Sequence, residues 1–260
     1  TGYSENEKRI DNTWRERIDY NAEALAKGGL IGFSADWPIF KLSQHADTPK
    51  FTMGNFWYGS AWPDYVAEAA QNYLQEEFRA AEIEPTPRII IYILGYLGAV
   101  ESVPDPETFK ILLRRTLEVL RDEAPDVAVF LKPHFNTDVD YVRELISEMA
   151  PNKFIVSYLH PAVLSTQAHF LVANYYSTTM AVARSFGVPV IEYSCYGDRA
   201  REIAKGGSIR PDIVDHYVDN NEDQFRLTVR ETLTQTEGSA IPSRVSEDSQ
   251  IIARLAGQAH

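Results

Sequence analysis

The stretch Arg88-Ile-Ile-Ile-Tyr-Ile-Leu-Gly95 is apolar from Ile89 to Leu94 and ends at a glycine. A continuous apolar run of this length is typical of a parallel strand that helices cover on both faces. A helix is predicted over residues 105–123, and the next apolar run, Val127-Ala-Val-Phe-Leu131, follows it directly. Strands that alternate with helices in this way predict a parallel α/β sheet.

The alternation continues toward the C-terminus. Three more strands are predicted at residues 153–158, 170–173 and 188–193, which gives five in all. Helices are predicted at residues 138–149, 178–186 and 223–235, and a short amphipathic helix at 248–256. The fold class that follows is a doubly wound, Rossmann-like parallel α/β sheet.

The N-terminal part is less complete. A helix is predicted at residues 5–27, short strands at 30–34 and 51–54, and a long helix at 63–81 before the proline-rich loop 84–87. We therefore divide the chain into a partial N-terminal α/β segment, residues 1–62, and a larger domain, residues 63–260, which begins with a linker helix.

Composition limits the function classes. The 260 residues carry 25 Lys and Arg against 37 Asp and Glu, a net charge of −12, which argues against a broad nucleic-acid surface. Cys195 is the one cysteine, so neither a disulfide framework nor a Cys-rich zinc site can form within one chain. No apolar run is long enough to span a bilayer and the first residues do not resemble a secretory signal, so a cytoplasmic protein is predicted.

Ligands of open parallel sheets bind outside the carboxyl ends of the strands. The residues with suitable chemistry just after the predicted strands are Gly95, Gly98, Lys132, His134, His160, Ser177, Thr178 and Thr179. Hydroxyls and backbone N–H groups at the helix start after residue 177 predict a phosphate site, although Ser177 could equally be a simple helix cap. Glycines 95 and 98 would let the backbone approach a ligand, or would only form a tight turn.

Lys132 and His134 could add a cation and a ring N–H donor beside the same phosphate. Either histidine, 134 or 160, could instead be structural, and we expect at least one of them to contact the ligand. No metal-binding motif or carboxylate cluster accompanies them, so no tightly bound metal is predicted. The six-residue glycine fingerprint of dinucleotide domains is absent from the sequence, which disfavours an NAD-dependent enzyme.

The stretch that carries a family resemblance is His160-Pro-Ala-Val-Leu-Ser-Thr-Gln-Ala-His-Phe-Leu-Val-Ala-Asn-Tyr-Tyr-Ser177-Thr-Thr-Met-Ala-Val-Ala-Arg-Ser-Phe-Gly187-Val-Pro-Val-Ile-Glu192-Tyr. Together with the region around it, residues 88–200, it resembles the nucleotide-binding half of GT-B glycosyltransferases and of nucleotide-sugar 2-epimerases. The helix at 178–184 lacks the glutamate with which relatives that use UDP- or GDP-sugars commonly hold the ribose.

A pair of short motifs indicates one branch of that family. Lys132-Pro133-His134 with Ser177-Thr178 resembles the paired motifs of bacterial CMP-sugar transferases, the GT-B sialyltransferases and Kdo transferases of capsule and lipopolysaccharide assembly. Phe135 departs from the pattern, since those enzymes often have proline there. The resemblance implies that His134 contacts the donor phosphate or cytidine, with Ser177 and Thr178 on the phosphate.

The resemblance also suggests roles outside these motifs. Residues 1–62 would be a reduced acceptor-side segment or part of a longer enzyme, with Asp36 either a catalytic carboxylate or a solvated loop residue. Glu192 could bind ribose or sugar hydroxyls, or only pair with Arg199 or Arg201. The aromatic side chains that could stack on sugar, or pack between the lobes, are Trp57, Tyr58 and Trp62.

The expected function is transfer of Kdo or sialic acid from a CMP-activated donor to a glycan or glycolipid acceptor during bacterial surface polysaccharide synthesis. A UDP-sugar transferase or 2-epimerase on the same fold is the alternative, and a non-catalytic nucleotide-binding module is a third. We expect no tightly bound cofactor and no nucleic-acid partner. Peripheral association with the inner membrane or with a larger synthase would fit this function.

Overall fold

The computed structural model of the protein describes residues 30–32, 50–52, 61–95, 106–134, 137–175, 177 and 179–236. The chain divides into two units, Thr1–Phe56 with Ser246–His260 and Trp57–Val245. In the first unit, the two predicted short strands are present as β1 (Leu30–Gly32) and β2 (Lys50–Thr52), and the structure adds that they pair in parallel. The helices predicted at 5–27 and 248–256 lie outside the described residues.

The second unit is built on a six-stranded sheet in which every pair of neighbours is parallel. Its order is β5-β4-β3-β6-β7-β8, so the chain starts in the middle, fills one edge, and returns to the middle with β6. The strands are β3 (Ile89–Ile93), β4 (Ala128–Lys132), β5 (Phe154–Val156), β6 (Ala168–Ala173), β7 (Val190–Ser194) and β8 (His216–Asp219). This is the doubly wound order, and it confirms the predicted fold class.

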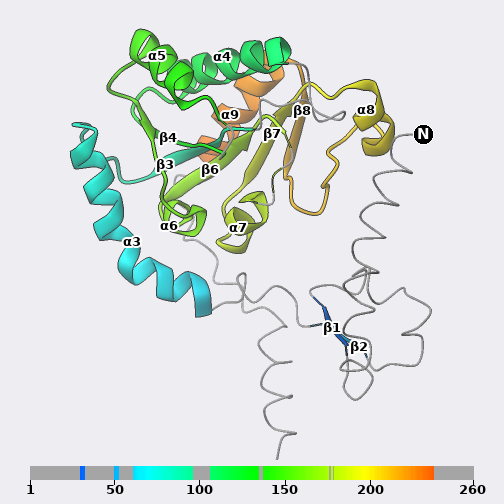
Figure 1. Cartoon of the computed structure of the whole chain (residues 1–260), viewed down its shortest axis with the longest axis horizontal. Coiled ribbons are helices and arrows are strands. Elements are labelled where there is room, and N and C mark those ends of the chain that lie inside the picture. Colours follow the sequence, from blue (N-terminus) through cyan, green and yellow to red (C-terminus); the bar gives the residue numbers. More distant parts are fainter. Residues whose placement is uncertain are drawn as a thin grey trace, which may run out of the picture. The chain divides into compact units, whose positions relative to one another are not determined.

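Helices cover both faces of this sheet, as Figure 1 shows. On one face lie α4 (Pro106–Glu123), α5 (Val139–Met149) and α9 (Glu222–Thr236); on the other lie α3 (Ala61–Ala80), α6 (Pro161–Ser165) and α7 (Thr179–Ser185). Successive residues of β3 alternate between the two cores: Ile90 and Tyr92 pack against the first set of helices, Ile89 and Ile91 against the second. The uninterrupted apolar run thus fills two cores at once.

The sequence-based prediction of five strands was wrong by one. β8 was missed because Val218 is the one fully buried residue in His-Tyr-Val-Asp, so no apolar run marks this edge strand. The helices α6 and α8 (Asp198–Ala204) were missed as well, since five and seven residues are too few to show a helical period. β6 also begins two residues before the predicted start, at Ala168.

No described helix is long and apolar enough to cross a membrane. Within the same residues, no group of three or more His, Cys, Asp and Glu side chains is arranged to hold a metal ion.

Candidate functional site

The carboxyl ends of the central strands form one row across the sheet. Ile93, the last residue of β3, is in register with Lys132 of β4 on one side and Ala173 of β6 on the other. Ala173 is in turn in register with Glu192 of β7. The chain reverses its winding direction between β3 and β6, and ligands of open α/β sheets bind in the crevice at this switch point. Lys132 is therefore one strand away from it.

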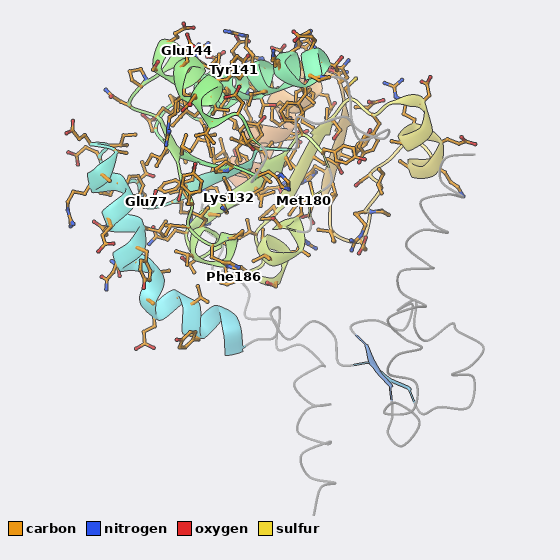
Figure 2. The ribbon with its side chains drawn as sticks, viewed as in Figure 1. Glu77, Lys132, Tyr141, Glu144, Met180 and Phe186 are labelled. Carbon is orange, nitrogen blue, oxygen red and sulfur yellow. The ribbon has the colours of Figure 1, made fainter. Side chains whose placement is uncertain are left out.

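Lys132 is half-buried at the end of β4 and has a lowered pKa, because burial penalises its charged form. Its Nζ lies 5.8 Å from the centroid of the Tyr158 ring, which comes from the loop after β5. Among the described residues no carboxylate forms an ion pair with it. Figure 2 shows Lys132 between the helical layers, with Tyr141 of α5 on one side and Phe186 on the other.

His160 lies close enough to Lys132 for their charges to interact. Burial, and then the positive charge of Lys132, lower the pKa of the imidazole. Its Nδ1 accepts a hydrogen bond from the backbone N–H of Ala162 at 3.2 Å, so the ring caps the N-terminus of α6. A nitrogen that accepts carries no proton, which places the proton of the neutral ring on Nε2 and makes that atom a donor.

His134 and Ser177 have local partners. The exposed His134 closes a tight turn, since its N–H donates to Thr137 Oγ1 at 2.8 Å and its carbonyl accepts from Thr137 N–H at 2.9 Å. Ser177 Oγ accepts from the N–H of Thr179 at 3.3 Å, and its carbonyl accepts from Met180 N–H at 3.1 Å. Ser177 therefore performs the capping role that the sequence left open, and phosphate binding there stays a prediction.

Gly95 has a packing reason to be a glycine. A Cβ on this residue would lie 2.9 Å from Cε2 and 3.3 Å from Cζ of Phe109, a core residue of α4. Thr179 is half-buried at the first position of α7. The remaining predicted site residues Asp36, Gly98, Thr178, Trp57 and Tyr58 lie outside the described part of the chain, as does the side chain of Trp62.

Glu192 is fully buried in the middle of β7. Its Oε1 accepts hydrogen bonds from Ser194 Oγ at 2.9 Å and from the Tyr196 hydroxyl, and its Oε2 accepts from Ser208 Oγ at 2.5 Å. Of the two arginines predicted as alternative partners, Arg201 lies 3.7 Å from Asp219 instead, and the side chain of Arg199 lies outside the described residues. Hydroxyl groups thus satisfy this carboxylate.

The sequence did not single out Asn174, which follows β6 directly at the switch point and is 1% exposed. Its Oδ1 accepts from the Tyr92 hydroxyl, while its Nδ2 donates to Thr116 Oγ1 at 2.8 Å and to the Tyr193 carbonyl at 2.9 Å. Its own carbonyl lies 2.7 Å from Ser194 Oγ, so it shares the single proton of that hydroxyl with Glu192 Oε1. One side chain therefore ties together β3, α4 and β7 beneath the site.

Solved structures with this sheet arrangement include enzymes of two kinds. The wall teichoic acid polymerase TagF (H444N variant) matches over 88% of this chain and 57% of its own, with 15% identity and a TM-score of 0.50. The UDP-GlcNAc 2-epimerase from Methanocaldococcus jannaschii matches over 80% of this chain and 56% of its own, with 17% identity and a TM-score of 0.52. The sheet has the Rossmann-like fold of GT-B enzymes.

At these identities the likeness concerns the fold alone. The chain spans somewhat more than half the length of either neighbour. No family model matches the sequence, and no curated protein is significantly similar to it.

Proposed function

We propose that this chain is the donor-binding part of a glycosyltransferase that uses a nucleotide-activated sugar, with CMP-activated Kdo or sialic acid as the donor. The observation that carries the proposal is the half-buried Lys132, which has no carboxylate partner in the described part of the chain, beside the switch point of a GT-B-type sheet. A buried cation needs a counter-charge, and the donor phosphate would supply it.

Stabilisation of the leaving group is the chemistry that this arrangement suits. As the bond between sugar and phosphate breaks, the departing nucleotide gains negative charge, which preorganised donors stabilise. The ammonium group of Lys132 and the Nε2–H of His160 would be two such donors at neighbouring strand ends. His134 would be a third in the proposed donor complex, from the turn after β4.

The choice of cytidine rests on the motif resemblance and on α7. The Lys132-Pro-His134 loop and the Ser177-Thr178 turn are similar to the motif pair of CMP-sugar transferases, and α7 carries no carboxylate to hold a ribose. A UDP-sugar transferase or 2-epimerase is the second candidate, because one structural neighbour is named a UDP-GlcNAc 2-epimerase. The polymerase neighbour, which is named for wall teichoic acid, fits a role in making surface polymers.

We place a glycan or glycolipid acceptor on residues 1–62, or on a domain that precedes them in a longer enzyme. Asp36 is the carboxylate that we propose as catalytic there. The reaction would take place in the cytoplasm, at the inner face of the membrane where surface polysaccharides are assembled.

The test is calorimetric titration of the chain with CMP, CDP, UDP and GDP, repeated with Lys132→Met. Loss of a charge-assisted contact should weaken the preferred nucleotide about 10- to 100-fold. Arg121→Met is the matched control, since Arg121 lies in the last turn of α4, away from the carboxyl ends of the strands, and should leave the affinity unchanged. A preference for UDP would favour the second candidate, and absence of binding to all four would overturn both.

A further inference from the structure

Tyr158 is an exposed aromatic residue at the carboxyl end of the sheet. It lies two residues after Val156, the last residue of β5, and is 64% exposed. The other large apolar residues exposed in the described part of the chain all lie on helices, namely Tyr65 and Tyr73 on α3, Ile111 on α4 and Leu227 on α9. Single exposed apolar residues of that kind are normal on a protein surface. Tyr158 differs because it is open to solvent at the edge where ligands of such sheets bind.

The backbone on both sides of Tyr158 is held by hydrogen bonds. Ser157 is fully buried, and its N–H donates to the Leu131 carbonyl at 2.9 Å, which continues the pairing of β5 with β4. Ser157 Oγ accepts the N–H of Leu159 at 3.2 Å, and the His160 ring caps α6. The loop 157–160 therefore presents Tyr158 from a fixed backbone, and a tyrosine side chain orders at a low cost in conformational entropy.

Tyr158 lies beside the cation of the proposed phosphate site. Lys132 Nζ is 5.8 Å from the centroid of the Tyr158 ring, within the range of a cation–π contact. The two residues follow neighbouring strand positions, since Leu131 of β4 is in register with Val156 of β5. A ligand that places an anion on Lys132 therefore comes within reach of an exposed aromatic ring.

We propose that Tyr158 is the platform on which the nucleobase of the donor stacks. The inference rests on the proposed function for the presence of a nucleotide. The ammonium group of Lys132 lies toward one side of the ring, and the exposed part of the ring is available to a base. Stacking on an aromatic side chain tolerates any base, because every base has a π-face. Tyr158 thus adds affinity for the nucleotide and leaves the choice of base to other contacts.

The strand order agrees with the direction in which a nucleotide would lie. β5 is the edge strand, β4 with Lys132 is next to it, and β3 and β6 form the switch point. Neighbouring strands are about 4.8 Å apart, so β3 is about 10 Å from β5. With the base on Tyr158, the ribose would lie over β4 and the phosphate between Lys132 and the helix start after Ser177, which is the phosphate site that the sequence predicts.

The experiment compares CMP, UMP and GMP with ribose 5-phosphate, which has the same sugar and phosphate groups but no base. In calorimetric titrations, Tyr158→Ala should weaken each nucleotide that the wild type binds about 5- to 150-fold and leave ribose 5-phosphate unchanged. Tyr158→Phe keeps the aromatic face and should bind as the wild type does. Tyr73→Ala, at an exposed tyrosine of α3, is the matched control and should leave the affinity for all four ligands unchanged.

A role limited to holding Lys132 in place would give a different result. In that case Tyr158→Ala would weaken ribose 5-phosphate as much as the nucleotide, because both carry the phosphate that Lys132 is proposed to bind. Equal losses for the two kinds of ligand would therefore overturn the platform. Since Tyr158 is exposed, thermal melts of Tyr158→Ala should match the wild type, which separates a loss of binding from a loss of fold.

The platform and the proposed function fail in different ways. If the wild type binds a nucleotide and Tyr158→Ala binds it equally well, the platform is refuted, while the proposed function is judged by its own Lys132→Met variant. If the wild type binds none of the nucleotides, both are refuted.

Discussion

Replacement of Asn174 by alanine should cost about 3–5 kcal/mol of the free energy of unfolding. The change removes the acceptor of the Tyr92 hydroxyl and the donor to Thr116 and Tyr193. A buried group left without its partner costs about 1–3 kcal/mol. Tyr92 is 0% exposed, so its stranded hydroxyl dominates, whereas Thr116 keeps its bond to the Leu112 carbonyl at 2.8 Å.

Urea unfolding followed by circular dichroism measures this loss as a lower midpoint at an unchanged slope. The control is Asn72→Ala, at an exposed position in α3, which should change stability by less than about 0.5 kcal/mol. A loss in Asn174→Ala as small as in this control would show that the hydrogen-bond cluster contributes little.

A double-mutant cycle with Tyr92→Phe isolates the interaction itself. Tyr92→Phe removes the hydroxyl that Asn174→Ala would strand, so the double variant should be more stable than the sum of the single losses by about 1–2 kcal/mol. Single losses that simply add would refute the reasoning, because they would mean that Tyr92 and Asn174 do not depend on each other.

Three further predictions concern single sites. Gly95→Ala should destabilise the protein by about 1–3 kcal/mol, since the new Cβ would lie 2.9 Å from the ring of buried Phe109. Adding Phe109→Leu to this variant should recover part of the lost free energy of unfolding in the same urea assay. The pKa of His160 is lower in the folded chain than its unfolded value of about 6.5, so the free energy of unfolding should fall as the pH drops through and below that value. His160→Asn keeps a helix cap without a titrating group, and melts at several pH values should lose that component; an unchanged pH dependence would contradict the assignment. Glu123→Gln should lower the melting temperature at neutral pH, because hydrogen bonds from Arg230 and then Arg226 stabilise the charged carboxylate and lower the pKa of Glu123. The difference in melting temperature from the wild type should shrink as the pH falls through that lowered pKa.

The central strands could be predicted because two covered faces demand apolar residues at every position. β3 and β6 are buried along their whole length, and their runs are unmistakable in the sequence. β8 lies at the edge of the sheet and buries one residue fully, so its pattern carries no such signal. Its place in the sheet follows only from pairing with β7, which no local pattern reveals.

The candidate site was predictable in position but not in its internal contacts. The rule that ligands bind at strand ends is enough to select Lys132 and His160, and register places Lys132 one strand from the switch point. The role of Asn174 depends on partners 82, 58 and 19 residues away, which a linear motif cannot contain. One signal was present for Glu192, since a carboxylate inside an apolar strand requires buried donors.

Lys132 on β4 and Glu192 on β7 lie in the same row of the sheet, but the groups that surround their charges differ. The hydroxyls of Tyr196 and Ser208 donate to Glu192, and Ser194 shares its one proton between Glu192 and the Asn174 carbonyl, so this carboxylate has its partners within the chain. Lys132 receives a tyrosine ring and an imidazole as neighbours but no carboxylate from the described residues. With a net charge of −12 over the chain, attraction of an anion has to come from such a local cation. Glu192 is therefore held by groups of the chain itself, whereas in the proposed function a ligand phosphate supplies the counter-charge of Lys132.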